Sequence, residues 1–131
     1  GIRPLPGVQD FLEQAYARGV PLALATSAAR EDILLQLELL DWERFFPVQI
    51  TGDDVSHHKP APDVYLAAAA GLGIEPSQGL AFEDAATGLQ SARSAGMQTV
   101  FVQDARFRVE PPFKPDLTIV SFVELMRGVD V

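Results

Sequence analysis

The chain has 131 residues, of which 47% are hydrophobic and none is cysteine, and 10 basic against 18 acidic residues give it a formal net charge of −8. This length suits a buried core, and we expect residues 1–131 to form a single domain. The acidic balance argues against nucleic acid and anionic membranes as partners. The longest nearly apolar run, Val64 to Ile74, is far shorter than the ~20 residues that cross a bilayer. The lack of cysteine excludes disulfides and a cysteine nucleophile and favours a reducing compartment, so we expect a cytoplasmic protein.

Helical patterns alternate with short apolar runs along the chain, which is typical of a parallel α/β sheet. Ser27 is expected to cap the second helix, because it follows an apolar run that turns polar at Thr26. The buried stripe of that helix is expected to comprise Ile33, Leu34, Leu37 and Leu40. The expected strands cover 21–26, 48–51, 80–82, 99–102 and 117–120, and the expected helices cover 8–18, a segment after Ser27, 62–71, 86–95 and a segment after Ser121. The fold class is therefore α/β, a Rossmann-like sheet with helices on both faces.

Polar residues that could act on a phosphate group follow the expected strands. Thr26 and Ser27 come after the first strand, Lys59 lies in the loop after the second, and Glu83 and Asp84 come after the third. Ligands of open α/β sheets bind beyond the carboxyl ends of the strands. Hydroxyl and N–H groups at a helix N-terminus accept anionic oxygens, an ammonium neutralises charge, and carboxylates hold Mg²⁺. The pattern predicts a phosphate and Mg²⁺ site.

Each of these features has a simpler interpretation when taken alone. Thr26 and Ser27 could only cap a helix, Lys59 could be a solvated loop residue, and the acidic pair could mark a turn. Their order along one sheet edge favours the site.

Two neighbouring pairs are assigned mainly structural roles. Asp53 and Asp54 are expected to be turn residues, with a metal or substrate role as the lesser alternative, and His57 and His58 lack a spaced third ligand and are expected on the surface.

Three segments resemble motifs of the haloacid dehalogenase-like hydrolases, in the branch that contains phosphoglycolate phosphatase and β-phosphoglucomutase. They are residues 22–27 (LALATS), 58–63 (HKPAPD) and 80–88 (LAFEDAATG). Residues 4–8 resemble the re-entry into the core after that branch's helical cap, so the resemblance covers nearly the whole chain.

The resemblance implies a Mg²⁺-dependent phosphatase that acts on a small phosphorylated metabolite through an aspartyl-phosphate. By that resemblance, Thr26 hydrogen-bonds the transferring phosphoryl group, Ser27 adds a phosphate contact, and Lys59 stabilises the charge of both the phosphoryl group and the nucleophile. Asp84, supported by Glu83, holds Mg²⁺. Phosphoryl transfer depends mostly on such positioning and charge stabilisation.

One family feature is missing from these residues. The family's first strand, the central strand of its sheet, carries an Asp-x-Asp motif with the nucleophile, and this sequence has no such motif. The chain therefore looks like the C-terminal two-thirds of a hydrolase core that is inactive by itself. Either another segment or chain supplies the strand, or the strands that end at Thr26 and Glu83 pair directly. An unpaired central edge also favours strand exchange or self-association.

Two other functions stay open at this point. A non-catalytic module that binds phosphate or a partner would also lack the nucleophile. A phosphorelay receiver domain combines Asp, Thr and Lys as well, but its acidic pair comes first, and here the order is reversed. The dinucleotide fingerprint, the Gly-x-x-x-x-Gly-Lys phosphate loop and the Gly-x-Ser-x-Gly nucleophile elbow do not occur in the sequence.

Overall fold

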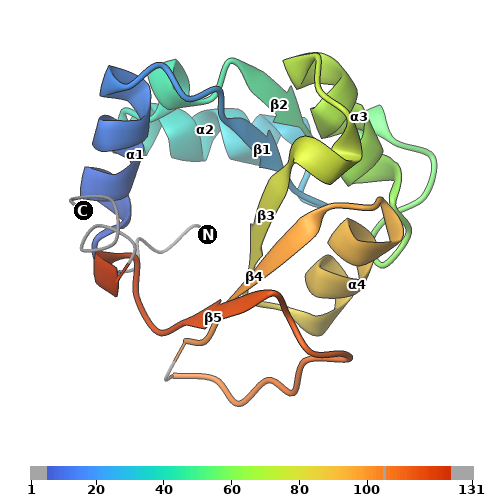
Figure 1. Cartoon of the computed structure of the whole chain (residues 1–131). Helices are drawn as coiled ribbons and strands as arrows, with labels where there is room; N and C mark the ends of the chain where they lie inside the picture. The colour runs from blue at the N-terminus through green and yellow to red at the C-terminus, as the bar shows by residue number, and fades with distance from the viewer. Residues whose placement is uncertain (1–5, 105, 125–131) are drawn as a thin grey trace.

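The computed structural model describes residues 6–104 and 106–124, which form an alternating series of helices and parallel strands (Figure 1). The elements agree with the expected order, and strand ends differ from it by one or two residues. The expected last helix lies mostly outside the described residues. The helices are α1 (Val8–Ala17), α2 (Arg30–Leu40), α3 (Asp63–Leu72) and α4 (Ala86–Ser94); the strands are β1 (Ala23–Ala25), β2 (Val48–Ile50), β3 (Leu80–Glu83), β4 (Gln98–Val102) and β5 (Leu117–Ile119).

The strands form two separate parallel sheets. β1 pairs with β2, in the register Leu24 opposite Gln49, and β3, β4 and β5 pair in that order. Within the described ranges, no strand lies between β1 and β3, and the two do not pair with each other. The described residues therefore rule out direct pairing, one of the two arrangements expected for these strands.

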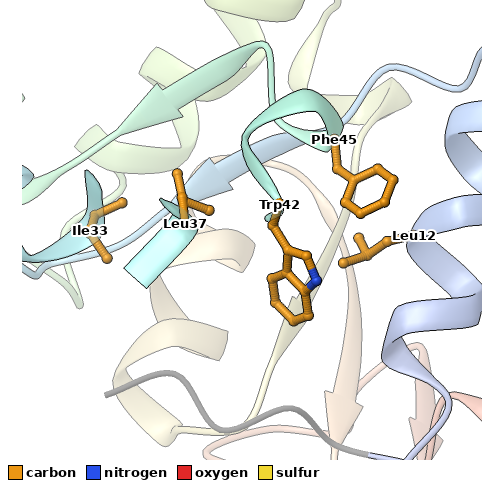
Figure 2. Packing of buried hydrophobic residues seen from close by; sticks show 5 residues of the cluster. All are labelled: Leu12, Ile33, Leu37, Trp42 and Phe45. Atoms are coloured by element: carbon orange, nitrogen blue, oxygen red, sulfur yellow. The ribbon is translucent and has the colours of Figure 1, made fainter. Parts of the chain in front are cut away.

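Helices cover both faces of the sheets, as expected from the alternation of helices and strands along the chain. Successive residues of a strand point to opposite faces. Leu24 accordingly packs against a cluster from α1, α2 and the short 3₁₀ turn Glu43–Phe45, whereas Ala25 packs against a cluster from α3, β3 and α4. Figure 2 shows the first cluster, which comprises Leu12, Ile33, Leu37, Trp42 and Phe45.

Two expectations for α2 are wrong. Leu34 is 47% exposed rather than buried, whereas Ile33 and Leu37 are buried and Leu40 packs against the same cluster. Ser27 does not cap the helix, which begins at Arg30. Asp53, far away in sequence, caps it instead, and its Oδ2 accepts a hydrogen bond of 2.9 Å from the Arg30 N–H.

In the described part of the chain, no helix is both long and apolar enough to cross a membrane.

Candidate active site

Lys59 joins the carboxyl ends of the two sheets. Its Nζ donates to the Ala25 carbonyl at the end of β1 (3.2 Å) and to Glu83 Oε1 at the end of β3 (2.5 Å). The Lys59 and Glu83 side chains are only 13% and 9% exposed. A buried carboxylate needs a charged partner to offset its lost hydration, and Lys59 supplies that charge. The two parallel sheets thus share one ammonium group at the edge where the sequence predicts a site.

Glu83 has a second donor and an unusually close neighbour. The buried Tyr65 hydroxyl, from α3, also donates to Oε1. Burial, and then the nearby Glu83 charge, raise the pKa of Tyr65 well above its ordinary value, so the phenol keeps its proton. A Cβ at Gly88 in α4 would lie 2.0 Å from Glu83 Oε2. Glycine at this position therefore leaves room for the Glu83 carboxylate.

Thr26 and Ser27 extend from β1 at the same edge. The Thr26 N–H continues the β1–β2 pairing with a bond to the Ile50 carbonyl (3.0 Å), and its Oγ1 accepts from the Ala28 N–H (3.1 Å). These bonds hold a partly buried hydroxyl one residue beyond the carbonyl that accepts from Lys59. Ser27 is exposed beside it.

Asp84 differs from Glu83 in its surroundings. It is exposed and lines a pocket of about 410 Å³, together with Asp104, Phe107 and Arg108. Neighbouring residues of a strand end point in different directions, so one carboxylate is enclosed by donors while the other faces the pocket. The part of the chain that the structure describes has no group of three acidic or histidine side chains able to hold a metal.

Asp53 and Asp54 have structural partners, in agreement with their assignment to a turn. Asp54 Oδ2 accepts from the Thr51 N–H (2.8 Å) and hydroxyl (2.9 Å) and pairs with the Arg30 guanidinium. The Thr51 N–H, followed by the Thr51 hydroxyl and Arg30, lowers the pKa of Asp54. These contacts fasten the loop after β2 to the start of α2.

The two histidines of the same loop lie on the surface, as expected. Both are exposed, and His57 Nδ1 lies 3.3 Å from Asp63 Oδ2.

A groove of about 700 Å³ separates β1 from β3, and its lining includes Ala25, whose carbonyl accepts from Lys59. Both strands contribute to its lining, as do α1 and α3, and most of the lining side chains are apolar. The strand edges that face the groove have no strand partner within the described residues. The lining includes Phe11, Leu24, Tyr65, Ala81 and Phe82.

Comparison with known proteins identifies relatives along most of the chain. Residues 1–102 match the haloacid dehalogenase-like hydrolase family. A phosphorylated carbohydrates phosphatase of Thermotoga maritima is 38% identical over 96 residues, which cover 73% of this chain and 44% of the relative. Phosphoglycolate phosphatase of Escherichia coli is 40% identical over 95 residues, which cover 72% of this chain and 38% of the relative.

A solved structure agrees over nearly all of the chain. CbbY from Rhodobacter sphaeroides, in complex with phosphate, superposes with a TM-score of 0.86 at 30% sequence identity. The match covers 97% of this chain and 59% of the other. The chain therefore spans less than half of the two curated relatives and rather more than half of CbbY.

Proposed function

Because this chain belongs to the haloacid dehalogenase-like hydrolases, we propose that it forms most of the core of a phosphatase that acts on a small phosphorylated metabolite. The observation that carries the proposal is the convergence of Lys59, Thr26 and Glu83 at the carboxyl ends of the two sheets. The phosphatase names of the relatives support it. The lack of cysteine favours a cytoplasmic location for this enzyme.

The residues of the edge would divide the work on the phosphoryl group. Lys59 would offset negative charge on the phosphoryl oxygens and on the attacking carboxylate. Thr26 would donate its hydroxyl proton to a phosphoryl oxygen, because its Oγ1 acts only as an acceptor toward the Ala28 N–H. Ser27, exposed next to it, would add a further donor. These groups position the phosphate and stabilise charge, which is most of what phosphoryl transfer needs.

Mg²⁺ is the metal that this donor set fits. Asp84 offers an exposed carboxylate, and Mg²⁺ in phosphoryl-transfer sites takes one or two carboxylates together with water and substrate oxygens. Glu83 Oε1 already accepts from Lys59 and Tyr65, so Asp84 is the better direct ligand and Glu83 the supporting one. When bound, the ion would neutralise phosphoryl charge.

The nucleophilic aspartate would come from a strand outside these 131 residues. The groove between β1 and β3 is the place for it, because a parallel strand there would pair with both unpaired edges and would end beside Lys59. Each buried backbone group left without a partner costs ~1–3 kcal/mol, so filling the groove is favourable. The carboxylate of the first aspartate would attack phosphorus as the bond to the leaving oxygen breaks, and the second aspartate of the Asp-x-Asp motif would give that oxygen a proton, so that an alcohol leaves. Water would then hydrolyse the aspartyl-phosphate to aspartate and phosphate.

The experiment is hydrolysis of p-nitrophenyl phosphate with Mg²⁺ by three proteins. The 131-residue chain should be inactive, a chain extended upstream by an Asp-x-Asp strand and cap should turn over, and Asp84→Ala in the extended chain should abolish that turnover. Turnover by the 131 residues alone would contradict the missing nucleophile, and Asp53 and Asp54 would then be tested first.

A non-catalytic phosphate- or partner-binding module is the second candidate, favoured by the absence of Asp-x-Asp from the sequence. Inactivity of the extended chain with a range of small phosphate esters would favour this module.

A second copy of the chain could also offer a strand to the groove. Sedimentation velocity tests this exchange, because the 131-residue chain would form dimers and the extended chain, with its groove filled, would not.

A further inference from the structure

Tyr65 is a buried titratable group to which the proposed chemistry assigns no role. It lies in α3, is 6% exposed, and its hydroxyl donates to Glu83 Oε1. Its ring also faces the ammonium of Lys59, whose Nζ lies 5.3 Å from the ring centroid. Tyr65 thus contacts both members of the ion pair that joins the two sheets, one through its hydroxyl and the other through its ring.

The Glu83 carboxylate is fixed from three directions. Tyr65 and Lys59 donate to the same oxygen, and Gly88 lies so near that a Cβ there would be 2.1 Å from the carboxyl carbon. A carboxylate with only one flexible lysine as partner could rotate, and the ammonium would follow it. A phenol on a rigid helix removes that freedom because its oxygen has one position relative to the sheet.

We propose that Tyr65 is a positioning residue, which holds the Glu83 carboxylate against Gly88 so that Glu83 in turn holds the Lys59 ammonium beside the Ala25 carbonyl. This inference deepens the proposed phosphatase function and rests on it for its catalytic consequence, whereas the placement of Lys59 can be measured without any activity. Tyr65 acts through Glu83 and touches no reacting atom.

The first test is spectroscopic and uses the 131-residue chain. The chain has only two lysines, Lys59 and the exposed Lys114, so ¹⁵N-lysine labelling marks only two side-chain ammonium groups. The Lys59 ammonium signal should be visible in the unmodified chain, because a buried, hydrogen-bonded ammonium exchanges its protons slowly. Tyr65→Phe should cause its loss, and Tyr16→Phe, which changes the other and exposed tyrosine, should not.

A second variant moves the carboxylate while it leaves the phenol in place. Gly88→Ala puts a methyl group where the Glu83 carboxylate lies, and it should also remove the Lys59 signal. A folded Tyr65→Phe protein that keeps the Lys59 signal unchanged overturns the proposal, with circular dichroism as the check of folding. If Tyr65→Phe does not fold, the test uses Glu83→Gln and the unmodified chain, both labelled with ζ-¹³C tyrosine. The chemical shift of Tyr65 should differ between the two proteins and that of Tyr16 should not. An unchanged Tyr65 shift overturns the proposal.

The kinetic test uses the extended, active chain. Tyr65→Phe should lower kcat about tenfold and leave KM for p-nitrophenyl phosphate within about twofold, because a displaced ammonium stabilises the transition state less. In a Glu83→Ala background, Tyr65→Phe should have no further effect. Full activity of Lys59→Ala would refute the role proposed for Lys59 itself. Loss of activity in Lys59→Ala with a normal rate in Tyr65→Phe would refute only the positioning role.

Discussion

The carboxyl-end edge and the groove beside it are built in opposite ways. At the edge, charged side chains from distant segments meet, as when Lys59 donates to Glu83 24 residues away. In the groove, β1 and β3 face each other across about 700 Å³ lined mostly by apolar side chains. The polar groups of the site are therefore held in place without the strand that would complete the sheet. The difference teaches that side chains can join two parallel sheets at their carboxyl ends even where the strands of the two sheets do not pair.

Among these predictions, removal of the Lys59 ammonium should have the largest effect, and it should act on catalytic activity. Lys59→Ala in the extended, active chain should lower kcat/KM by at least ~10²-fold, the range found when a preorganised electrostatic group is lost. The measurement is steady-state hydrolysis of p-nitrophenyl phosphate, with Lys114→Ala, an exposed lysine, as the matched control. A rate within threefold of the unmodified protein would exclude Lys59 from the site.

The wall of the groove contains packed aromatic rings rather than charged groups, and we expect these rings to contribute to stability. The Phe11 ring of α1 lies 5.5 Å from Phe82 and 5.2 Å from Phe122, between centroids. Phe11→Ala should lower the free energy of unfolding by ~2–4 kcal/mol, because it removes these contacts and widens the groove. Urea unfolding measures the change, and Phe107→Ala, at a ring that is 64% exposed, should cost under ~0.5 kcal/mol. A loss of unfolding free energy in Phe11→Ala as small as that in Phe107→Ala would mean that the groove wall contributes nothing to stability.

The order of elements and the side of the sheet that carries the candidate site follow from local patterns. Apolar runs identify the strands, and parallel strands bring Thr26, Lys59 and Glu83 to one edge. The contact of Tyr65 with Glu83 could not be predicted in the same way, because it joins α3 to β3 across the interior. A glycine inside a helical pattern, Gly88, was the available signal of a close approach there.

The start of α2 shows the same limit on sequence reasoning. Ser27 has the right residue type for a cap and stands just before a helical pattern, yet Ala29 occupies the N-cap position and Asp53, from another loop, accepts the hydrogen bond from the Arg30 N–H. Residue propensity describes only what a residue can do locally. The loop after β2 brings the Asp53 carboxylate to the helix in the folded chain, and no pattern near α2 in the sequence predicts this contact.

The hydrogen bond between Asp53 and the start of α2 should make a moderate contribution to the stability of the folded chain. Asp53→Ala leaves the Arg30 N–H without its acceptor and should lower the free energy of unfolding by ~1 kcal/mol. Asp53→Asn keeps an acceptor oxygen and should recover most of the loss, as measured by urea unfolding. If Asn and Ala are equally destabilising, the hydrogen bond to the helix is not what Asp53 contributes.

The smallest effect should come from Asp54 and should depend on pH. The Thr51 N–H, the Thr51 hydroxyl and Arg30 lower the pKa of Asp54 from its ordinary 3.8 in the folded chain, so folding favours the ionised carboxylate. The stabilisation is therefore fully present above pH 3.8 and is lost as pH falls through the lower folded-state pKa. Asp54→Asn should consequently be less stable than the unmodified chain at pH 6, and the gap should shrink as pH is lowered below 3.8 in urea-unfolding series. A gap that stays constant with pH would show that the Asp54 charge makes no net contribution, and that the neutral amide differs from it only in shape.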